Sequence, residues 1–251
     1  MHRSSYFRLL RPARLAVALL AFAAFASADS FIDAYNIDSS RGGFMWIDEN
    51  GAPTNVYAGV IDIALTENGQ TYYRDTLCVD LFTDIDEGVT YETQVLDPSM
   101  VPGRQLGRVA WLIDNALMPT QNQNYSSVLP SSDWVTSPAQ GEGIQLAIWD
   151  ITNDGGNGLS TGGVQASSDP NNPTPSNVLN WANQYESLSA GHTSNQAFVY
   201  NNWALGSLTP AQMLEGPVFK DNGPAPAPEP LTYVLVGTTL VGFGLRRRMV
   251  R

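Results

Sequence analysis

The sequence predicts an α+β fold: an antiparallel β-sandwich or barrel-like part with a small helical subdomain. Two segments rich in β-branched residues flank an Asn-Gly turn, the strongest short signal for an antiparallel hairpin. Two other segments carry apolar residues at the spacing of an amphipathic helix. Strands and helices do not alternate as they do in a parallel sheet, and no internal repeat is present.

The hairpin is predicted from residues 55–65 and 71–81, with residues 67–70 as its turn. Side chains alternate between the two faces of a strand. In the second strand one face carries four apolar residues: Tyr73, Leu77, Val79 and Leu81. The other face is more polar and carries Arg74, Thr76, Cys78 and Asp80. This placement does not favour a simple core role for Cys78.

Residues 104–118 are predicted to form a helix that Pro119 ends. Residues 178–188 are predicted to form a second helix, followed by a strand at residues 196–200. Between them, residues 143–151 form an apolar run that is either a strand or a buried helix, since periodicity cannot decide at this length. The polar stretches on either side of that run, 120–142 and 152–177, are predicted to be loops.

The first 28 residues are predicted to be a cleavable signal peptide. Four arginines and no acidic residue come first, an apolar run covers residues 15–25, and Ala26-Ser27-Ala28 has the small-x-small pattern of a cleavage site. The apolar run is too short to span a bilayer comfortably. We therefore expect the exported chain to begin near Asp29, with a domain over residues 29–222.

The C-terminal end combines three features in a fixed order. A proline-rich linker, residues 223–230, ends in Pro228-Glu229-Pro230, and a glycine-containing apolar run follows. The chain then closes on a basic cluster: Arg246, Arg247, Arg248 and Arg251. Together these features resemble the PEP-CTERM sorting signal of Gram-negative bacteria. The resemblance implies recognition by an exosortase, cleavage near the Pro-Glu-Pro motif, and delivery to the cell envelope or extracellular matrix.

Residues 231–251 are accordingly expected to be a sorting and transmembrane tail. As a helix, the apolar run would reach only about 22 Å, short of a bilayer core of about 30 Å. Such a length suits a transient hold, so contact with the membrane is expected through this tail alone. The terminal arginines would stay cytoplasmic, leaving residues 29–230 outside.

Between the two ends the chain is strongly acidic. It has five basic residues against all 24 Asp and Glu of the sequence, a formal net charge of −19. Such a surface repels phosphate backbones, which argues against nucleic-acid binding. Cys78 is the single cysteine, so no intramolecular disulfide can form in a protein expected to reach an oxidising compartment.

Two segments carry the candidate chemistry, residues 77–80 and residues 144–149. Gln145 lies in an apolar run and must find hydrogen-bond partners, because an unpaired buried amide costs about 1–3 kcal/mol. It either bonds to backbone groups or meets the Cys78 thiol. In the second case, attack of sulfur on the carboxamide carbon with loss of ammonia gives an internal thioester that needs no cofactor or metal. Four residues are predicted to keep water from that bond: Leu77, Val79, Ile148 and Trp149.

Three matches in order resemble the thioester domains of bacterial surface adhesins. They are Cys78 on an early strand, a hydrophobic helix over residues 108–115 that ends in Asn115, and Gln145-Leu146-Ala147-Ile148-Trp149. The resemblance covers residues 43–200. It implies a covalent link between Cys78 and Gln145, and capture of an amine-bearing surface protein or polysaccharide. The capture would be a single acyl transfer, so the protein is not expected to be an enzyme.

Three other functions remain open. A cysteine hydrolase would need a base near Cys78, and His192 is the histidine that the exported part offers. Calcium binding by residues 150–157, or by Asp84, Asp86 and Glu87, is a loose match, because Thr161 stands where an EF-hand loop needs Glu. The third is a non-reactive structural or carbohydrate-binding envelope module, with candidate platforms at Trp111, Trp134, Trp149, Trp181 and Trp203.

Overall fold

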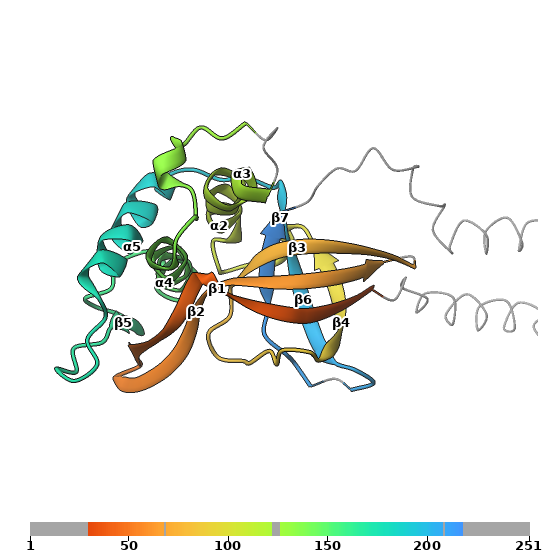
Figure 1. Ribbon diagram of the computed structural model, residues 1–251, viewed down its shortest axis with the longest axis horizontal. Helices are drawn as coiled ribbons and strands as arrows, with labels where there is room; N and C mark the ends of the chain where they lie inside the picture. Colours follow the sequence, from red (N-terminus) through yellow and green to blue (C-terminus); the bar gives the residue numbers. More distant parts are fainter. Residues whose placement is uncertain (1–29, 68, 122–125, 208, 218–251) are drawn as a thin grey trace, which may run out of the picture. The chain divides into compact units, whose positions relative to one another are not determined.

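The computed structural model describes residues 30–67, 69–121, 126–207 and 209–217, which belong to one contact unit, Ser30–Phe219. The predicted signal peptide, proline-rich linker and sorting tail lie outside the described residues. Within them no helix combines the length and the apolar character needed to cross a membrane. The described part has the predicted α+β fold (Figure 1).

Six strands of the described residues close into an antiparallel barrel. Their order around the ring is β2 (Ala52–Glu67), β3 (Gln70–Cys78), β7 (Leu214–Pro217), β6 (Ala197–Ala204), β4 (Thr90–Leu96) and β1 (Ser30–Glu49). The pairing of β1 with β2 closes the ring. A short strand, β5 (Val164–Ala166), pairs with the far end of β1. The barrel-like part predicted from the sequence is confirmed.

The predicted hairpin is formed by β2 and β3, with Glu67 opposite Gln70 and Gly69 at a φ of 76° in the turn. The second strand was predicted to reach Leu81, but β3 ends at Cys78. It ends there because the chain bends at Val79 and the Asp80 carboxylate accepts a hydrogen bond from the Phe82 N–H.

Strands β1 and β2 are long and bend sharply where they leave the barrel (Figure 1). Gly42 lies opposite Gly59 at this bend, and Gly59 has a φ of 146°. A Cβ on Gly59 would lie 2.4 Å from the Gly42 Cα, so no side chain fits between the two backbones. Beyond the bend the two strands continue to the helical part, where both contact α4 (Pro138–Asp154).

The apolar run that the sequence left undecided is helical, and α4 extends well beyond it. Ser137 caps the helix by accepting a hydrogen bond from the Gln140 N–H, and Pro138 occupies the first turn. Residues 120–142 were predicted to be a loop; this was wrong from Pro138 onward. The second predicted helix is confirmed as α5 (Ser176–Ser189), and the strand predicted after it as β6.

The first predicted helix does not end at Pro119. Helix α2 (Leu106–Leu112) continues through a π-helical turn, η2 (Ile113–Leu117), into α3 (Met118–Gln121). The Met118 N–H donates to the Ile113 carbonyl, five residues back, which restarts the helix. Pro119 therefore lies in the first turn of α3, where a missing N–H donor is tolerated. Two short 3₁₀ helices complete the described elements, η1 (Pro98–Met100) and η3 (Ser131–Asp133).

Helix α4 lies between two clusters of buried apolar residues and supplies side chains to both. Two glycines allow its first turns to pack closely. A Cβ on Gly141 would lie 1.7 Å from the Arg41 carbonyl oxygen of β1, and one on Gly143 would lie 2.4 Å from the Trp181 Cβ of α5. The close packing at Gly141 and Gly143 fixes the position of Gln145, which follows them in the same helix.

Candidate functional site

The structure brings together Cys78 at the end of β3 and Gln145 in α4, 67 positions apart in sequence. The Cys78 N–H donates to Gln145 Oε1 at 3.0 Å. In return, Gln145 Nε2 donates to the Cys78 carbonyl oxygen at 2.7 Å. The carboxamide is therefore held by two reciprocal hydrogen bonds alongside the cysteine backbone.

The course of β2 explains why Gln145 is needed there. Pairing of β2 with β3 ends at Ile61 and Thr76, because β2 bends away at Gly59. On the other edge of β3, the Val79 N–H bonds to the Met213 carbonyl next to β7. Backbone groups alternate in direction along a strand, so the N–H and C=O of Cys78 point away from β7, toward the place β2 has left. The Gln145 side chain takes the position of the missing strand.

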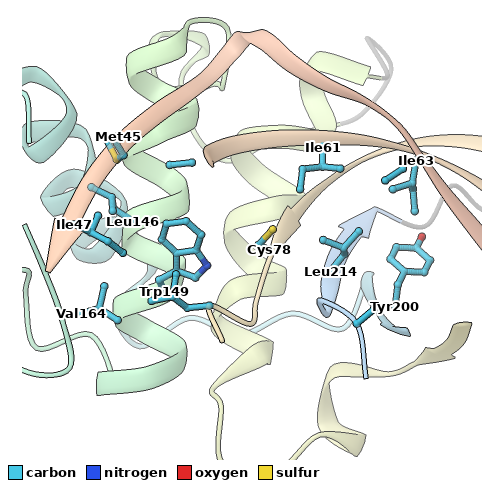
Figure 2. Packing of buried hydrophobic residues seen from close by; sticks show 14 of the residues in the cluster. Met45, Ile47, Ile61, Ile63, Cys78, Leu146, Trp149, Val164, Tyr200 and Leu214 are labelled. Atoms are coloured by element: carbon cyan, nitrogen blue, oxygen red, sulfur yellow. The ribbon is translucent and has the colours of Figure 1, made fainter. Parts of the chain in front are cut away.

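The predicted face of Cys78 did not favour a core role, and this expectation was wrong. Its side chain is 2% exposed and belongs to the first hydrophobic cluster, together with Ile61, Trp149 and Leu214 (Figure 2). Thr76, on the same face of β3, is also fully buried. The end of β3 is covered on both faces because it runs into the helical part of the molecule.

Burial raises the pKa of the Cys78 thiol far above its usual range, and the nearby carboxylates of Asp80 and Asp84 raise it further. The thiol is therefore protonated at neutral pH and does not act as a free thiolate nucleophile. Any reaction at this sulfur has to transfer its proton as the new bond forms.

The four residues predicted to shield the site are all buried, but they lie in two places. Trp149 shares the first hydrophobic cluster with Cys78. Leu77, Val79 and Ile148 belong to the second cluster. Neighbouring side chains of a strand point to opposite faces, which separates Leu77 and Val79 from the Cys78 sulfur. Trp149 is thus the member of the predicted set that lies in the same cluster as Cys78 (Figure 2).

The hydrogen bond on Gln145 Oε1 has a chemical consequence. When a nucleophile adds to the carboxamide carbon, negative charge develops on this oxygen, and the Cys78 N–H is already directed at it. A preorganised donor in a site without water stabilises such an oxyanion more strongly than water does. The arrangement therefore suits acyl transfer at the Gln145 carbonyl.

His192 is not brought to the cysteine by any interaction of the described residues. The imidazole is exposed and stacks on Trp111, with ring centroids 4.6 Å apart. A cysteine hydrolase based on Cys78 and His192 finds no support in this geometry.

Two acidic residues in the last turns of α4 hold the loop that follows the helix. The Asp154 carboxylate accepts hydrogen bonds from the N–H groups of Gly163 and Val164, and Asp150 accepts one from Gly158. No group of three or more His, Cys, Asp or Glu side chains with metal-binding geometry occurs in the part of the chain that the structure describes. Of the five candidate tryptophan platforms, Trp149 is 1% exposed and is a core residue; the other four are half-buried.

One feature was missed by the sequence-based predictions: a cleft of about 680 Å³ between β1, β2 and the loop 81–87. Trp149 and Ile61 line the cleft and also pack in the cluster that contains Cys78. The cleft combines residues from segments far apart in sequence, so pattern alone could not reveal it. The available signal was the acidic cluster in loop 81–87, which was considered only as a calcium site.

No protein-family model matches the chain, and no curated protein matches it. Among solved structures, the N-terminal domain of the Streptococcus pyogenes pilus tip adhesin Cpa is similar, with 9% sequence identity and a TM-score of 0.37. The match covers 74% of this chain and 98% of that one.

Proposed function

We propose that residues 29–222 form an exported cell-surface module in which Cys78 and Gln145 make an internal thioester that captures an amine-bearing target. The observation that carries this proposal is the pair of hydrogen bonds between the Gln145 carboxamide and the Cys78 backbone, inside a buried cluster. The same two hydrogen bonds also satisfy the buried amide of an unreacted glutamine. A chemical test therefore distinguishes the thioester from the unreacted pair.

The bond-forming step balances without another reactant. The Cys78 sulfur adds to the Gln145 carboxamide carbon, and the carbon–nitrogen bond breaks. The thiol proton passes to the leaving nitrogen, which departs as ammonia. The Cys78 N–H stabilises the oxyanion during this step, and the buried surroundings keep water from hydrolysing the product.

Capture then replaces the carbon–sulfur bond with an amide. An incoming amine adds to the same carbon, the thiol leaves, and the target remains joined to Gln145. Thiolate leaves more readily than an amide nitrogen, so the step is downhill and is not reversed. Each molecule reacts once, which distinguishes this module from an enzyme.

The test is the intact mass of residues 29–222 purified without added amines. We expect a mass one ammonia below the sequence value, and addition of methylamine should raise it by one methylamine. Cys78→Ala and Gln145→Glu should each show the unmodified mass. Gln94→Glu, on the exposed side of β4, is the matched control and should behave like the wild type.

An unmodified wild-type mass with Cys78 open to alkylation after unfolding would reject the thioester. The protein would then be a non-reactive envelope or matrix module, in which Gln145 serves only to complete the end of β3. The export signals at both ends are tested separately, by following processing near Asp29 and near Pro228-Glu229-Pro230 in cells with and without the exosortase-type enzyme.

A further inference from the structure

The cleft between β1, β2 and the loop 81–87 is separate from the candidate site, since neither Cys78 nor Gln145 lines it. Its volume of about 680 Å³ lies within the range of about 300–1,000 Å³ that is typical of ligand sites. The proposed capture reaction does not use this cleft. What the cleft can bind therefore follows from its own lining.

Aromatic rings line part of the cleft. Phe44 is 71% exposed and Phe82 is 55% exposed, and these are the two exposed phenylalanines of the part of the chain that the structure describes. Both line the cleft, as does the half-buried Tyr57, whose ring meets that of Phe44 edge-on at a centroid distance of 5.6 Å. Exposed apolar rings are unfavourable in water, so their presence together in one cleft indicates a ligand that covers them.

The same cleft is acidic. Its lining contains four carboxylates and no Lys, Arg or His: Glu49, Asp84, Asp86 and Glu87. None of the four takes part in a salt bridge of the described residues. The exported chain is acidic throughout, so negative charge alone does not distinguish this cleft. The combination of carboxylates with exposed rings does, because carboxylates and the faces of aromatic rings both attract a cation.

The acidic loop of the cleft is held in place by hydrogen bonds of its backbone. The Gln212 N–H donates to the Asp84 carbonyl oxygen at 3.1 Å, and the Asp86 N–H donates to the Tyr91 hydroxyl oxygen at 2.8 Å. A loop that is already ordered loses less conformational entropy when a ligand binds. The three carboxylates of the loop are therefore presented to a ligand at little entropic cost.

Trp149 offers a hydrogen-bond donor to a ligand. Its side chain lines the cleft and is 1% exposed, and its Nε1–H has no hydrogen-bond partner among the described residues. A buried donor without a partner is unfavourable, so an acceptor brought by a ligand would stabilise the complex. A peptide carries a carbonyl oxygen at every residue, whereas a simple cation carries no acceptor.

We propose that this cleft is a non-covalent binding site for an arginine side chain on a peptide segment of a partner protein. A planar guanidinium stacks on aromatic rings, is less strongly hydrated than an ammonium, and binds a carboxylate through two parallel N–H groups. The volume of the cleft suits a ligand larger than one side chain, so residues that flank the arginine bring their carbonyl groups into it. A guanidinium stays protonated in proteins, so binding leaves both partners unmodified and does not depend on the thioester.

The test is an NMR titration of the isotope-labelled exported protein with a short acetylated and amidated peptide in which arginine alternates with glycine. At low ionic strength, where charges are weakly screened, the amide resonances of the loop 81–87 should shift. Citrulline, the uncharged analogue of arginine with the same shape, should raise Kd about tenfold or more when it replaces each arginine. Lysine in the same positions should raise Kd about threefold or more. Cys78→Ala should bind the arginine peptide as the wild type does.

Removal of carboxylates tests the role of charge. Asp84→Asn/Glu87→Gln should raise the Kd of the arginine peptide about fivefold or more, because both carboxylates line the cleft. The matched control, Glu67→Gln/Glu92→Gln, removes the same charge from residues that do not line the cleft. It should change Kd by less than about twofold, since separated charges on the surface are screened.

Removal of the rings tests the aromatic contribution. Phe44→Leu/Phe82→Leu keeps the two positions apolar but deletes both rings, and it should raise Kd about threefold or more. Both side chains are exposed, so the fold should not depend on them. Tyr73→Leu is the control, because Tyr73 is 66% exposed and does not line the cleft. It should leave Kd unchanged.

Several results would overturn the arginine site. They are loop resonances that do not move up to the solubility limit of the peptide, equal affinities for the arginine and citrulline peptides, tighter binding of the lysine peptide, and equal losses in the cleft and control variants. Tighter binding of a neutral chito-oligosaccharide would assign the cleft to a carbohydrate and would also reject the proposal. None of these results bears on the thioester, which the intact mass tests separately.

Discussion

At the scale of single residues, the Gln145 side chain makes the hydrogen bonds that a neighbouring β-strand would otherwise make. Its carboxamide satisfies both backbone groups of Cys78 where β2 has bent away. Sequence reasoning predicted that this glutamine needs partners and considered both the backbone and the thiol. It placed Cys78 on a polar face, because Arg74 and Asp80 lie on that face near the two ends of the segment. The alternation of side chains between the two faces of β3 was correct. The face with Cys78 is buried because α4 covers it, and the sequence of the strand alone does not show this.

Replacing Gln145 should destabilise the domain even where no thioester can form. In a Cys78→Ala background, Gln145→Leu leaves the N–H and C=O of residue 78 buried and unpaired, and we expect a loss of about 2–5 kcal/mol in the free energy of unfolding. Urea unfolding monitored by tryptophan fluorescence measures it. Gln94→Leu, at an exposed position, should cost less than about 0.5 kcal/mol. Equal losses for the two variants would show that the Gln145 hydrogen bonds contribute little.

Several carboxyl groups have raised pKa values, so stability should depend on pH. Burial, with Asp150 beside it, raises the pKa of Glu186 from 4.5 to about 7. Burial raises the pKa of Asp114 to about 6 and holds that of Glu215 well above its usual range. The folded protein therefore binds more protons than the unfolded chain between about pH 4 and 7, and its stability falls as pH rises through that range.

Glu186→Gln tests this sign. Because the glutamine does not ionise, the variant should lose less stability than the wild type between pH 5 and pH 8. Thermal unfolding temperatures at the two pH values give the comparison, with Glu67→Gln on the β2–β3 hairpin as the control. A wild type that becomes more stable on going from pH 5 to pH 8 would contradict the assignment.

At the scale of elements, α4 decides how the site is assembled. Its apolar run was too short for periodicity to separate a strand from a helix, and the helix start lay in a stretch predicted to be a loop. The overlooked signal was Ser137-Pro138 followed by Gln140, a capping pattern that precedes the run. The first predicted helix was wrong in the opposite sense, because it was predicted to end too early. A proline normally ends a helix, but the π-helical turn before Pro119 removes the need for its missing donor.

The glycines of α4 give a prediction that reverses the usual rule. Alanine in place of a helical glycine normally stabilises a protein by about 1 kcal/mol. At Gly141 the new Cβ would lie 1.7 Å from the Arg41 carbonyl, so Gly141→Ala should push α4 from β1, lower stability, and reduce the fraction of protein carrying the thioester. Intact mass and thermal unfolding measure both effects. Gly107→Ala in α2 is the matched control, because its Cβ meets nothing closer than 3.5 Å and should be neutral or stabilising.

At the scale of the whole molecule, the barrel and the helical part meet around Arg41, just before the bend of β1. Its guanidinium lies 2.5 Å from both Asp38 and Asp75, and 3.6 Å from Asp62. Burial is the main cause that raises the pKa of Asp62 to about 6, with Asp75 adding to it. One cation thus holds three carboxylates together at the junction.

Arg41→Met should therefore destabilise the domain, and more at pH 8 than at pH 5. At pH 8 Asp62 is charged and, without the guanidinium, is repelled by the neighbouring carboxylates, whereas at pH 5 Asp62 is largely protonated. Urea unfolding at the two pH values measures the difference. Arg74→Met, at a half-buried position of β3, serves for comparison. A loss that is the same at both pH values would show that Arg41 acts through packing alone.

The class of fold, the β2–β3 hairpin and α5 could be predicted because local patterns determine them. Strands β1, β4 and β7 could not: β1 bends at glycines and is only partly apolar, and β7 has four residues. The pairing of Cys78 with Gln145 was a hypothesis that local pattern alone could not establish, since it depends on where β2 leaves β3. The cleft was not predicted, because its lining residues come from five separate parts of the chain.

The order of the chain through the barrel decides which parts would carry mechanical tension. In the proposed function, a captured target is covalently attached to Gln145, while the chain is anchored to the cell on the C-terminal side of β7. The covalent path between them runs through the rest of α4, β5, α5, β6 and β7, and none of β1 to β4 lies on it. Capture also releases Cys78, so these first four strands would carry no load through covalent bonds. Strand β7, clamped between β3 and β6, would be pulled along its length, and its hydrogen bonds on both edges would share the force.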